Sequence, residues 1–100
     1  MPARMTLDRE KLINFCKRHQ IVKLSLFGSV LRDDFGPESD VDFLAVWDPA
    51  LRLSYFDIIS QEEELSEIIG RKADLRSPGE ISRYFRQRVL DQAEPVYDAV

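Results

Sequence analysis

The chain has 100 residues, a net charge of −4, 32% charged residues and a single cysteine. A chain of this length has room for one layered core, so we expect residues 1–100 to form a single domain. The acidic balance makes nucleic acid an unlikely main partner, because phosphate contacts need a basic face. No apolar run has the length of a membrane span. The lone Cys16 excludes an internal disulfide and favours a reducing, cytoplasmic location.

The first half of the chain predicts alternating helices and strands. The elements expected are a helix from Leu7 to about His19, a strand over Ile21–Phe27, a short helix from Val30 to Asp33 or Asp34, and a strand over Asp40–Trp47. Thr6 is the expected cap of the first helix. Cys16 lies on its apolar side and is expected to fill the core. His19 has no second ligand at metal spacing, which favours a structural or surface role over metal binding.

The second half predicts two longer helices around a short strand. The elements expected are a helix from Ser54 to Ile69, a strand over Ala73–Arg76, a helix over about Gly79–Asp91, and a short strand or docked tail over Pro95–Tyr97. Ser54 and Asp57 resemble a capping box, and Gly70 suits the helix end. Tyr55 is expected on the apolar stripe of the first of these helices, and the run over 61–64 on its solvated face.

This order of elements predicts the fold class. Helices alternate with strands along the whole chain, which is typical of an α/β (α+β) protein. We expect a small mixed β-sheet with helices packed on one side.

One segment carries the chemistry of a candidate site. Gly28 and Ser29 end the first expected strand, and a ten-residue spacer separates them from Asp40 and Asp42. Residues two apart on a strand share one face and lie about 7 Å apart, so these carboxylates repel unless a cation lies between them. Hard divalent ions prefer such oxygen ligands. A Gly-Ser turn can present backbone N–H groups and a hydroxyl to phosphate. The segment therefore predicts a metal-bound nucleoside triphosphate.

The segment resembles the signature of the DNA polymerase β-like nucleotidyltransferases. The whole chain, from about Leu7 to Tyr97, resembles the minimal nucleotidyltransferase (MNT) domains of that superfamily, which act as antitoxins beside HEPN-domain toxins. The resemblance implies the nucleotidyltransferase fold. It also implies an enzyme that uses Mg²⁺ to transfer AMP from ATP to a tyrosine of its HEPN toxin.

The resemblance also implies a role for each site residue. Asp40, Asp42 and Asp74 match the three metal-binding and catalytic carboxylates, and Asp74 could take the proton from the acceptor hydroxyl. Gly28 and Ser29 would hold the terminal phosphates. For Asp74, a salt bridge to Arg71 or Lys72 is the structural alternative.

One position in the segment departs from the family pattern. The family commonly has Gly-Ser-x-Ala-Arg-Gly, whereas this chain has Asp33 where the last glycine stands. Arg32 is retained, either to contact phosphate or to neutralise a neighbouring carboxylate. Asp33 adds negative charge near the triphosphate and leaves every metal-ligand position intact.

Two other functions remain open from the sequence. The chain could be a non-catalytic antitoxin that neutralises its toxin by covering it, although masking alone does not require three matched carboxylates. A small-molecule adenylyltransferase is disfavoured, because the chain has no second domain to hold such a substrate. The oligomeric state also stays open, with a homo-oligomer among the alternatives.

Overall fold

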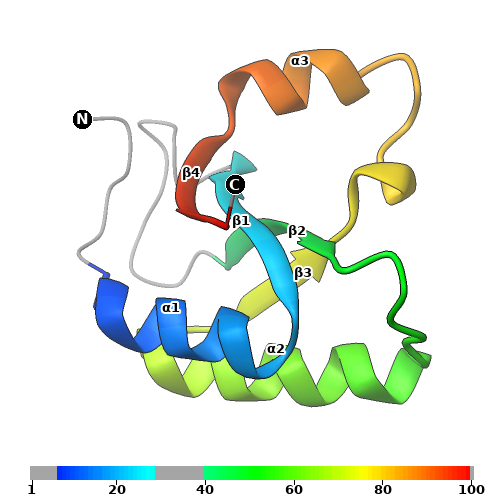
Figure 1. The fold of residues 1–100 in the computed structure, drawn as a ribbon. Coiled ribbons are helices and arrows are strands. Elements are labelled where there is room, and N and C mark those ends of the chain that lie inside the picture. Colours follow the sequence, from blue (N-terminus) through cyan, green and yellow to red (C-terminus); the bar gives the residue numbers. More distant parts are fainter. Residues whose placement is uncertain (1–6, 29–39, 100) are drawn as a thin grey trace.

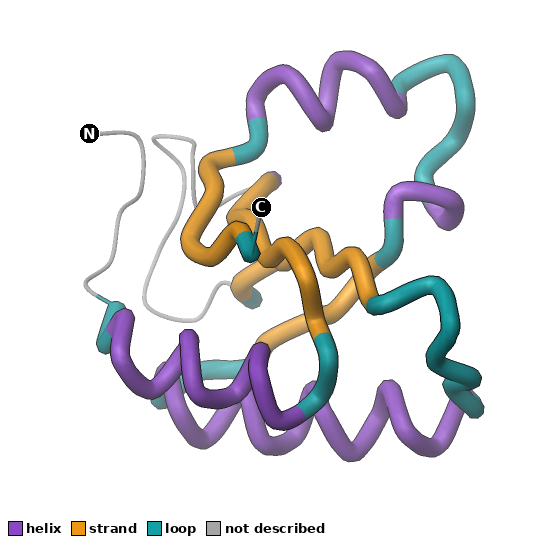
Figure 2. The backbone as a smooth tube through the Cα atoms, viewed as in Figure 1, coloured by secondary structure: helices purple, strands orange, loops and turns teal. Residues whose placement is uncertain are grey.

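The computed structural model describes residues 7–28 and 40–99, which form a four-stranded sheet with helices on both of its faces (Figures 1 and 2). In chain order the elements are α1 (Arg9–Arg18), β1 (Ile21–Phe27), β2 (Val41–Trp47), α2 (Tyr55–Ile69), β3 (Ala73–Arg76), the 3₁₀ helix η2 (Pro78–Glu80), α3 (Arg86–Gln92) and β4 (Glu94–Asp98). The short helix expected from Val30 lies outside the described residues.

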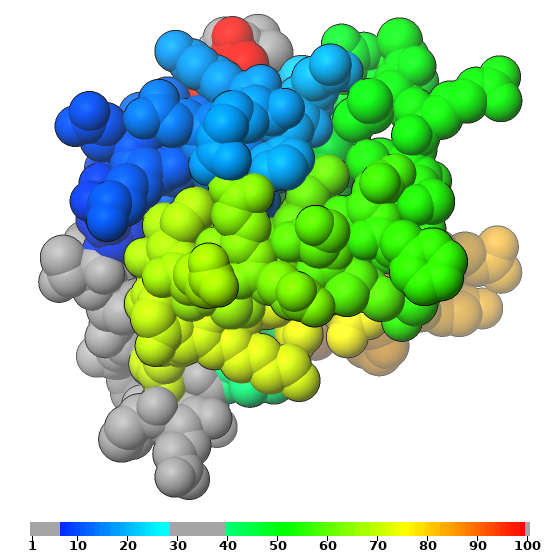
Figure 3. All heavy atoms as spheres, turned by 90° about the horizontal axis from the view of Figure 1, so that it is seen from below, coloured from blue at the N-terminus to red at the C-terminus, as the bar shows by residue number. Residues whose placement is uncertain are grey.

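The sheet is mixed, as predicted. Its strand order is β3-β2-β1-β4; β2 pairs parallel with β3, and β1 pairs antiparallel with both of its neighbours. Seen from below, α1 and α2 lie side by side and cover one face (Figure 3). α3 departs from the expected one-sided arrangement, since it lies over the opposite face.

The core lies between the sheet and the pair α1 and α2. Apolar side chains from both layers are fully buried there, because alternate strand residues point toward the helices. The largest are Leu12, Phe15, Ile21, Leu24, Leu26, Val41, Phe43 and Leu65. Cys16 belongs to this core, as predicted, and burial raises the pKa of its thiol to about 12.

The first helix begins later than predicted. Asp8 is its N-cap and accepts a hydrogen bond from the Lys11 backbone N–H at 3.1 Å, so α1 starts at Arg9. At the other end His19 lies 2.8 Å from Glu64 of α2, which also forms an ion pair with Arg18. Burial acts to raise the pKa of Glu64, but the hydrogen bonds and charges of His19 and Arg18 outweigh it and hold that pKa below its ordinary value. The structural role predicted for His19 is thus to join α1 to α2.

The last predicted helix is interrupted. Instead of one helix over 79–91, η2 ends at Glu80, the backbone of the following Ile81 is extended, and α3 begins only at Arg86. Ser82 provides an alternative to the helical hydrogen bonds, because its hydroxyl accepts from the Tyr84 N–H at 3.4 Å. Arg86 donates to the Ile81 carbonyl at 3.1 Å, which satisfies a group that the break leaves outside a helix.

The second helix has the predicted ends but not the predicted faces. The Ser54–Asp57 capping box and the left-handed Gly70 are present. However, Tyr55 is 74% exposed rather than on the core stripe, while Gln61 is 5% exposed and accepts a hydrogen bond from the Trp47 indole at 2.9 Å. None of the helices in the described part of the chain is long and apolar enough to cross a membrane.

Candidate active site

The parallel pairing of β2 with β3 brings two of the predicted site residues together. Asp42 and Asp74 are direct partners in the register of these strands, and both side chains are half-buried. Neighbouring strands lie about 4.8 Å apart, and residues opposite each other share one face of the sheet. Both carboxylates therefore lie on the face opposite the core helices, as close neighbours from two strands.

Gly28 lies against Asp42. It follows Phe27, the register partner of Asp42, and its φ of 77° lies in the left-handed region that favours glycine. A Cβ atom at this position would lie 2.5 Å from Asp42 Oδ2, far closer than atoms in contact can come. The absence of a side chain at Gly28 thus leaves the space that the Asp42 carboxylate occupies.

Asp40 immediately precedes β2 and is exposed. Its Oδ2 lies 3.8 Å from the ammonium of Lys72, and both side chains are well exposed, so this ion pair contributes little to stability. The Val41 N–H donates to the Lys72 carbonyl at 2.9 Å, which holds the start of β2 beside the residue before β3. The structural alternative for Asp74 was a salt bridge to Arg71 or Lys72, and the ion pair of Lys72 is with Asp40 instead.

The residues present suit a hard divalent cation by their chemistry. Asp42 and Asp74 offer carboxylate oxygens from adjacent strands, and the side-chain-free Gly28 allows the Asp42 carboxylate to lie where it does. Within the described residues, no three Asp, Glu, His or Cys side chains converge as a metal-binding group, so Asp40, Asp42 and Asp74 do not form a ready-made set of three ligands. Ser29 and Arg32, predicted to hold phosphate, lie outside the described residues, as does Asp33.

Two side chains of α2 hold the strand that carries Asp74. β3 is an edge strand, and its outward N–H groups need partners. The Ala73 N–H donates to Ser66 Oγ at 2.9 Å, and the Leu75 N–H donates to the Glu62 carboxylate at 2.7 Å. The backbone is thus fixed on both sides of Asp74.

This function of α2 was not predicted, since the run over 61–64 was expected on the solvated face. Glu62 and Ser66 lie four residues apart, so they are neighbours on one side of the helix. That spacing of two hydrogen-bond acceptors, just before an expected edge strand, was the available signal.

A first prediction concerns Glu62. We expect Glu62→Ala to lower the free energy of unfolding by about 1–3 kcal/mol, because the part-buried Leu75 N–H loses its acceptor. Glu62→Gln keeps an acceptor oxygen and should lose much less. Glu63 is exposed and adjacent on the same helix, so Glu63→Ala is the matched control. Urea denaturation checks these values, and equal losses for Glu62→Ala and Glu63→Ala would contradict the role assigned to Glu62.

The chain is similar to known nucleotidyltransferases. The sequence profile of the family "Polymerase beta, Nucleotidyltransferase" matches residues 10–99. "Putative protein adenylyltransferase MJ0435" from Methanocaldococcus jannaschii is 27% identical over 88 residues, which span 88% of this chain and 92% of that protein.

Solved structures share the fold. One described as a "putative minimal nucleotidyltransferase" is 29% identical, with a TM-score of 0.71 and 87% of each chain covered. A toxin–antitoxin structure with AMP-PNP has a TM-score of 0.73 at 20% identity, covering 92% of this chain and 74% of the other. A complex of tri-AMPylated Shewanella oneidensis HEPN toxin with MNT antitoxin has a TM-score of 0.64 at 20% identity, covering 90% and 69%.

The profile match extends over nearly the whole chain and includes Gly28, Asp40, Asp42 and Asp74. The fold of the described residues agrees with it, because the mixed sheet places Asp42 and Asp74 side by side. The chain belongs to the polymerase beta nucleotidyltransferase family, and it is a nucleotidyltransferase.

Proposed function

We propose that this protein transfers AMP from ATP to a tyrosine of a HEPN-domain toxin, requires Mg²⁺, and thereby acts as an antitoxin in the cytoplasm. The observation that carries the proposal is the register pairing of Asp42 with Asp74 beside Gly28. Support for the nucleotide and the acceptor comes from similar proteins: one is named an adenylyltransferase, one structure is a toxin–antitoxin with AMP-PNP, and another contains an AMPylated HEPN toxin.

The reaction is a phosphoryl transfer, which depends on positioning and charge stabilisation. The acceptor oxygen forms a bond to the α-phosphorus, the bond from that phosphorus to the β-bridging oxygen breaks, and pyrophosphate leaves. Asp74 would take the proton of the acceptor hydroxyl, while Asp40, Asp42 and Asp74 would hold Mg²⁺. Bound Mg²⁺ supplies positive charge against the triphosphate. Ser29 and Arg32 remain the proposed phosphate contacts.

A protein acceptor agrees with the surface of the chain. Aromatic side chains are unusually exposed at the start of α2 and before α3: Tyr55 is 74%, Phe56 79% and Tyr84 80% exposed. Exposed aromatic groups are typical anchors of protein interfaces. The surface therefore favours a protein partner, whether it is modified or only covered.

Intact-mass measurement tests the proposal directly. We expect the protein, incubated with ATP, Mg²⁺ and a HEPN-domain protein encoded beside it, to add AMP to a tyrosine of that partner. Asp74→Ala should stop the addition, because the proposed proton acceptor is lost, and omission of Mg²⁺ should do the same. Tyr84→Ala should weaken partner binding and leave the bound nucleotide unaffected.

A second readout separates catalysis from masking. An AMPylated toxin stays inactive after this protein is removed, whereas a toxin that was only covered regains activity. A toxin without added mass that recovers on separation would establish the binding-only antitoxin instead.

A further inference from the structure

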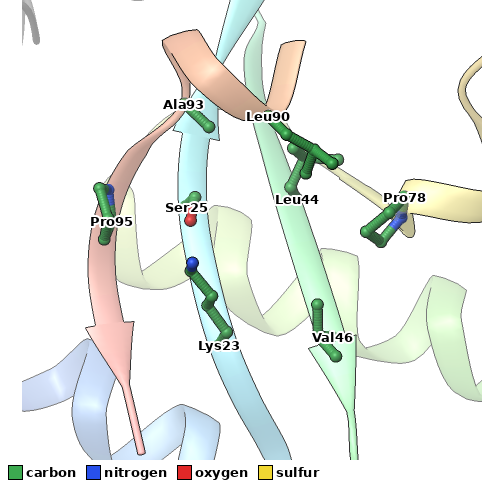
Figure 4. A pocket seen from close by; sticks show the side chains of 8 residues that line it. All are labelled: Lys23, Ser25, Leu44, Val46, Pro78, Leu90, Ala93 and Pro95. Carbon is green, nitrogen blue, oxygen red and sulfur yellow. The ribbon is translucent and has the colours of Figure 1, made fainter. Parts of the chain in front are cut away.

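A cavity of about 220 Å³ lies between the sheet and α3, on the same face as Asp42 and Asp74. Its floor is formed by two register pairs of β1 and β2, Ser25 with Leu44 and Lys23 with Val46 (Figure 4). Leu90 and Ala93 complete it at the C-terminal end of α3. The cavity is thus an apolar chamber whose floor belongs to the strands that carry Gly28 and Asp42.

The cavity lies next to the candidate active site along β1 and β2. The next pair in the same register is Phe27 with Asp42, two residues along each strand from Ser25 and Leu44. Two residues of a strand span about 7 Å. If the phosphorus of a ligand lies at Asp42, the part of the ligand next to that phosphorus can therefore lie in the cavity.

The lining of the cavity is mostly apolar, with one positively charged group on the side of Asp42. Leu44, Val46 and Leu90 provide apolar contact, and Val46 and Leu90 are 37% and 41% exposed, so the cavity is open to a ligand. The Lys23 side chain runs along β1 with its ammonium toward Ser25, which is the side of Asp42 (Figure 4). A ligand that fits has an apolar ring in the chamber and a negatively charged or hydroxyl-bearing end toward Lys23.

We propose that this cavity holds the nucleoside of the nucleotide substrate, with its base against Leu44, Val46 and Leu90 and its sugar–phosphate end toward Lys23. This inference rests on the proposed function. The cavity is smaller than the 300 Å³ or more typical of whole-ligand pockets, so it receives a ring system and leaves the triphosphate outside, beside Gly28 and Asp42.

Binding measurements with two ligands test the proposal, namely ATP and inorganic tripolyphosphate, each with Mg²⁺. Ala93→Leu places a larger side chain in the cavity and should raise the Kd of ATP about tenfold or more. It should leave the Kd of tripolyphosphate unchanged, because that ligand has no nucleoside. Lys23→Met keeps the stem, removes the charge, and should also weaken ATP more than tripolyphosphate.

Two control variants repeat the same substitutions away from the cavity. Ala50→Leu adds the same side chain at an exposed loop position, and Lys17→Met removes an exposed lysine of α1; neither should change ATP binding. An unchanged Kd of ATP in folded Ala93→Leu overturns the proposal, and so does a raised KM for the protein acceptor with ATP binding intact. If the unmodified protein binds neither ligand, the proposed function itself fails.

Discussion

Asp42→Asn is expected to lower the rate of nucleotidyl transfer by about a hundred- to a thousandfold. The change keeps the shape of the side chain and removes its negative charge. Asp42 lies opposite Asp74 in the register of β2 and β3 and against Gly28 at the end of β1. On the proposed function, loss of its charge should therefore weaken the binding of the metal ion.

The same variant should remain folded. Two carboxylates about 5 Å apart repel by about 3 kcal/mol at an effective dielectric near 20, so removing one charge without metal should not lower the free energy of unfolding. Asp48 follows the other end of β2, and Asp48→Asn is the charge-matched control. Transfer is measured by release of pyrophosphate, and stability by urea denaturation without Mg²⁺. Undiminished transfer by Asp42→Asn would rule out its role as a ligand.

Local patterns were sufficient for two of the strands. The bounds predicted for β1 and β3, Ile21–Phe27 and Ala73–Arg76, are those of the structure, because alternating apolar residues and flanking turn signals are read within a few positions. The capping box at Ser54 and the left-handed Gly70 are equally local and were confirmed. Such features need no information from distant parts of the chain.

The errors occur where a distant contact decides. Nothing in the run over 61–64 shows that the Trp47 indole needs Gln61, or that the edge of β3 needs Glu62. The break before α3 is instead held by short-range side-chain contacts, those of Ser82 with Tyr84 and of Arg86 with Ile81. Helical periodicity predicts a continuous helix and polar residues in water, and side-chain hydrogen bonds override both.

In the candidate site, too, local features were predictable and contacts between strands were not. The spacing of Asp40 and Asp42 is visible in the sequence, whereas the placement of Asp74 beside them came from the family resemblance; its register partnership with Asp42 is a property of the sheet. The contact of Gly28 with Asp42 could not be predicted, since it depends on the pairing of β1 with β2. Gly28 was expected to serve the phosphates, and the structure adds a second reason for a glycine at this position.

The second large effect is expected for Gly28→Ala. Its left-handed φ costs an alanine about 1–2 kcal/mol, and the new Cβ would lie 2.5 Å from Asp42 Oδ2. A carboxylate at the end of a side chain can turn away, so the fold survives and the ligand is displaced. A misplacement of about 1 Å can cost a hundredfold in rate, which is the loss of transfer we expect.

Gly70→Ala is the matched control for Gly28→Ala. Its φ is 74°, almost that of Gly28, but a Cβ there would meet nothing within 4 Å. Both alanine variants should therefore lose similar free energy of unfolding, because both place alanine in the left-handed region. Only Gly28→Ala should lose transfer activity. Equal activities of the two variants would mean that backbone strain, and not the position of Asp42, is the whole effect of a side chain at Gly28.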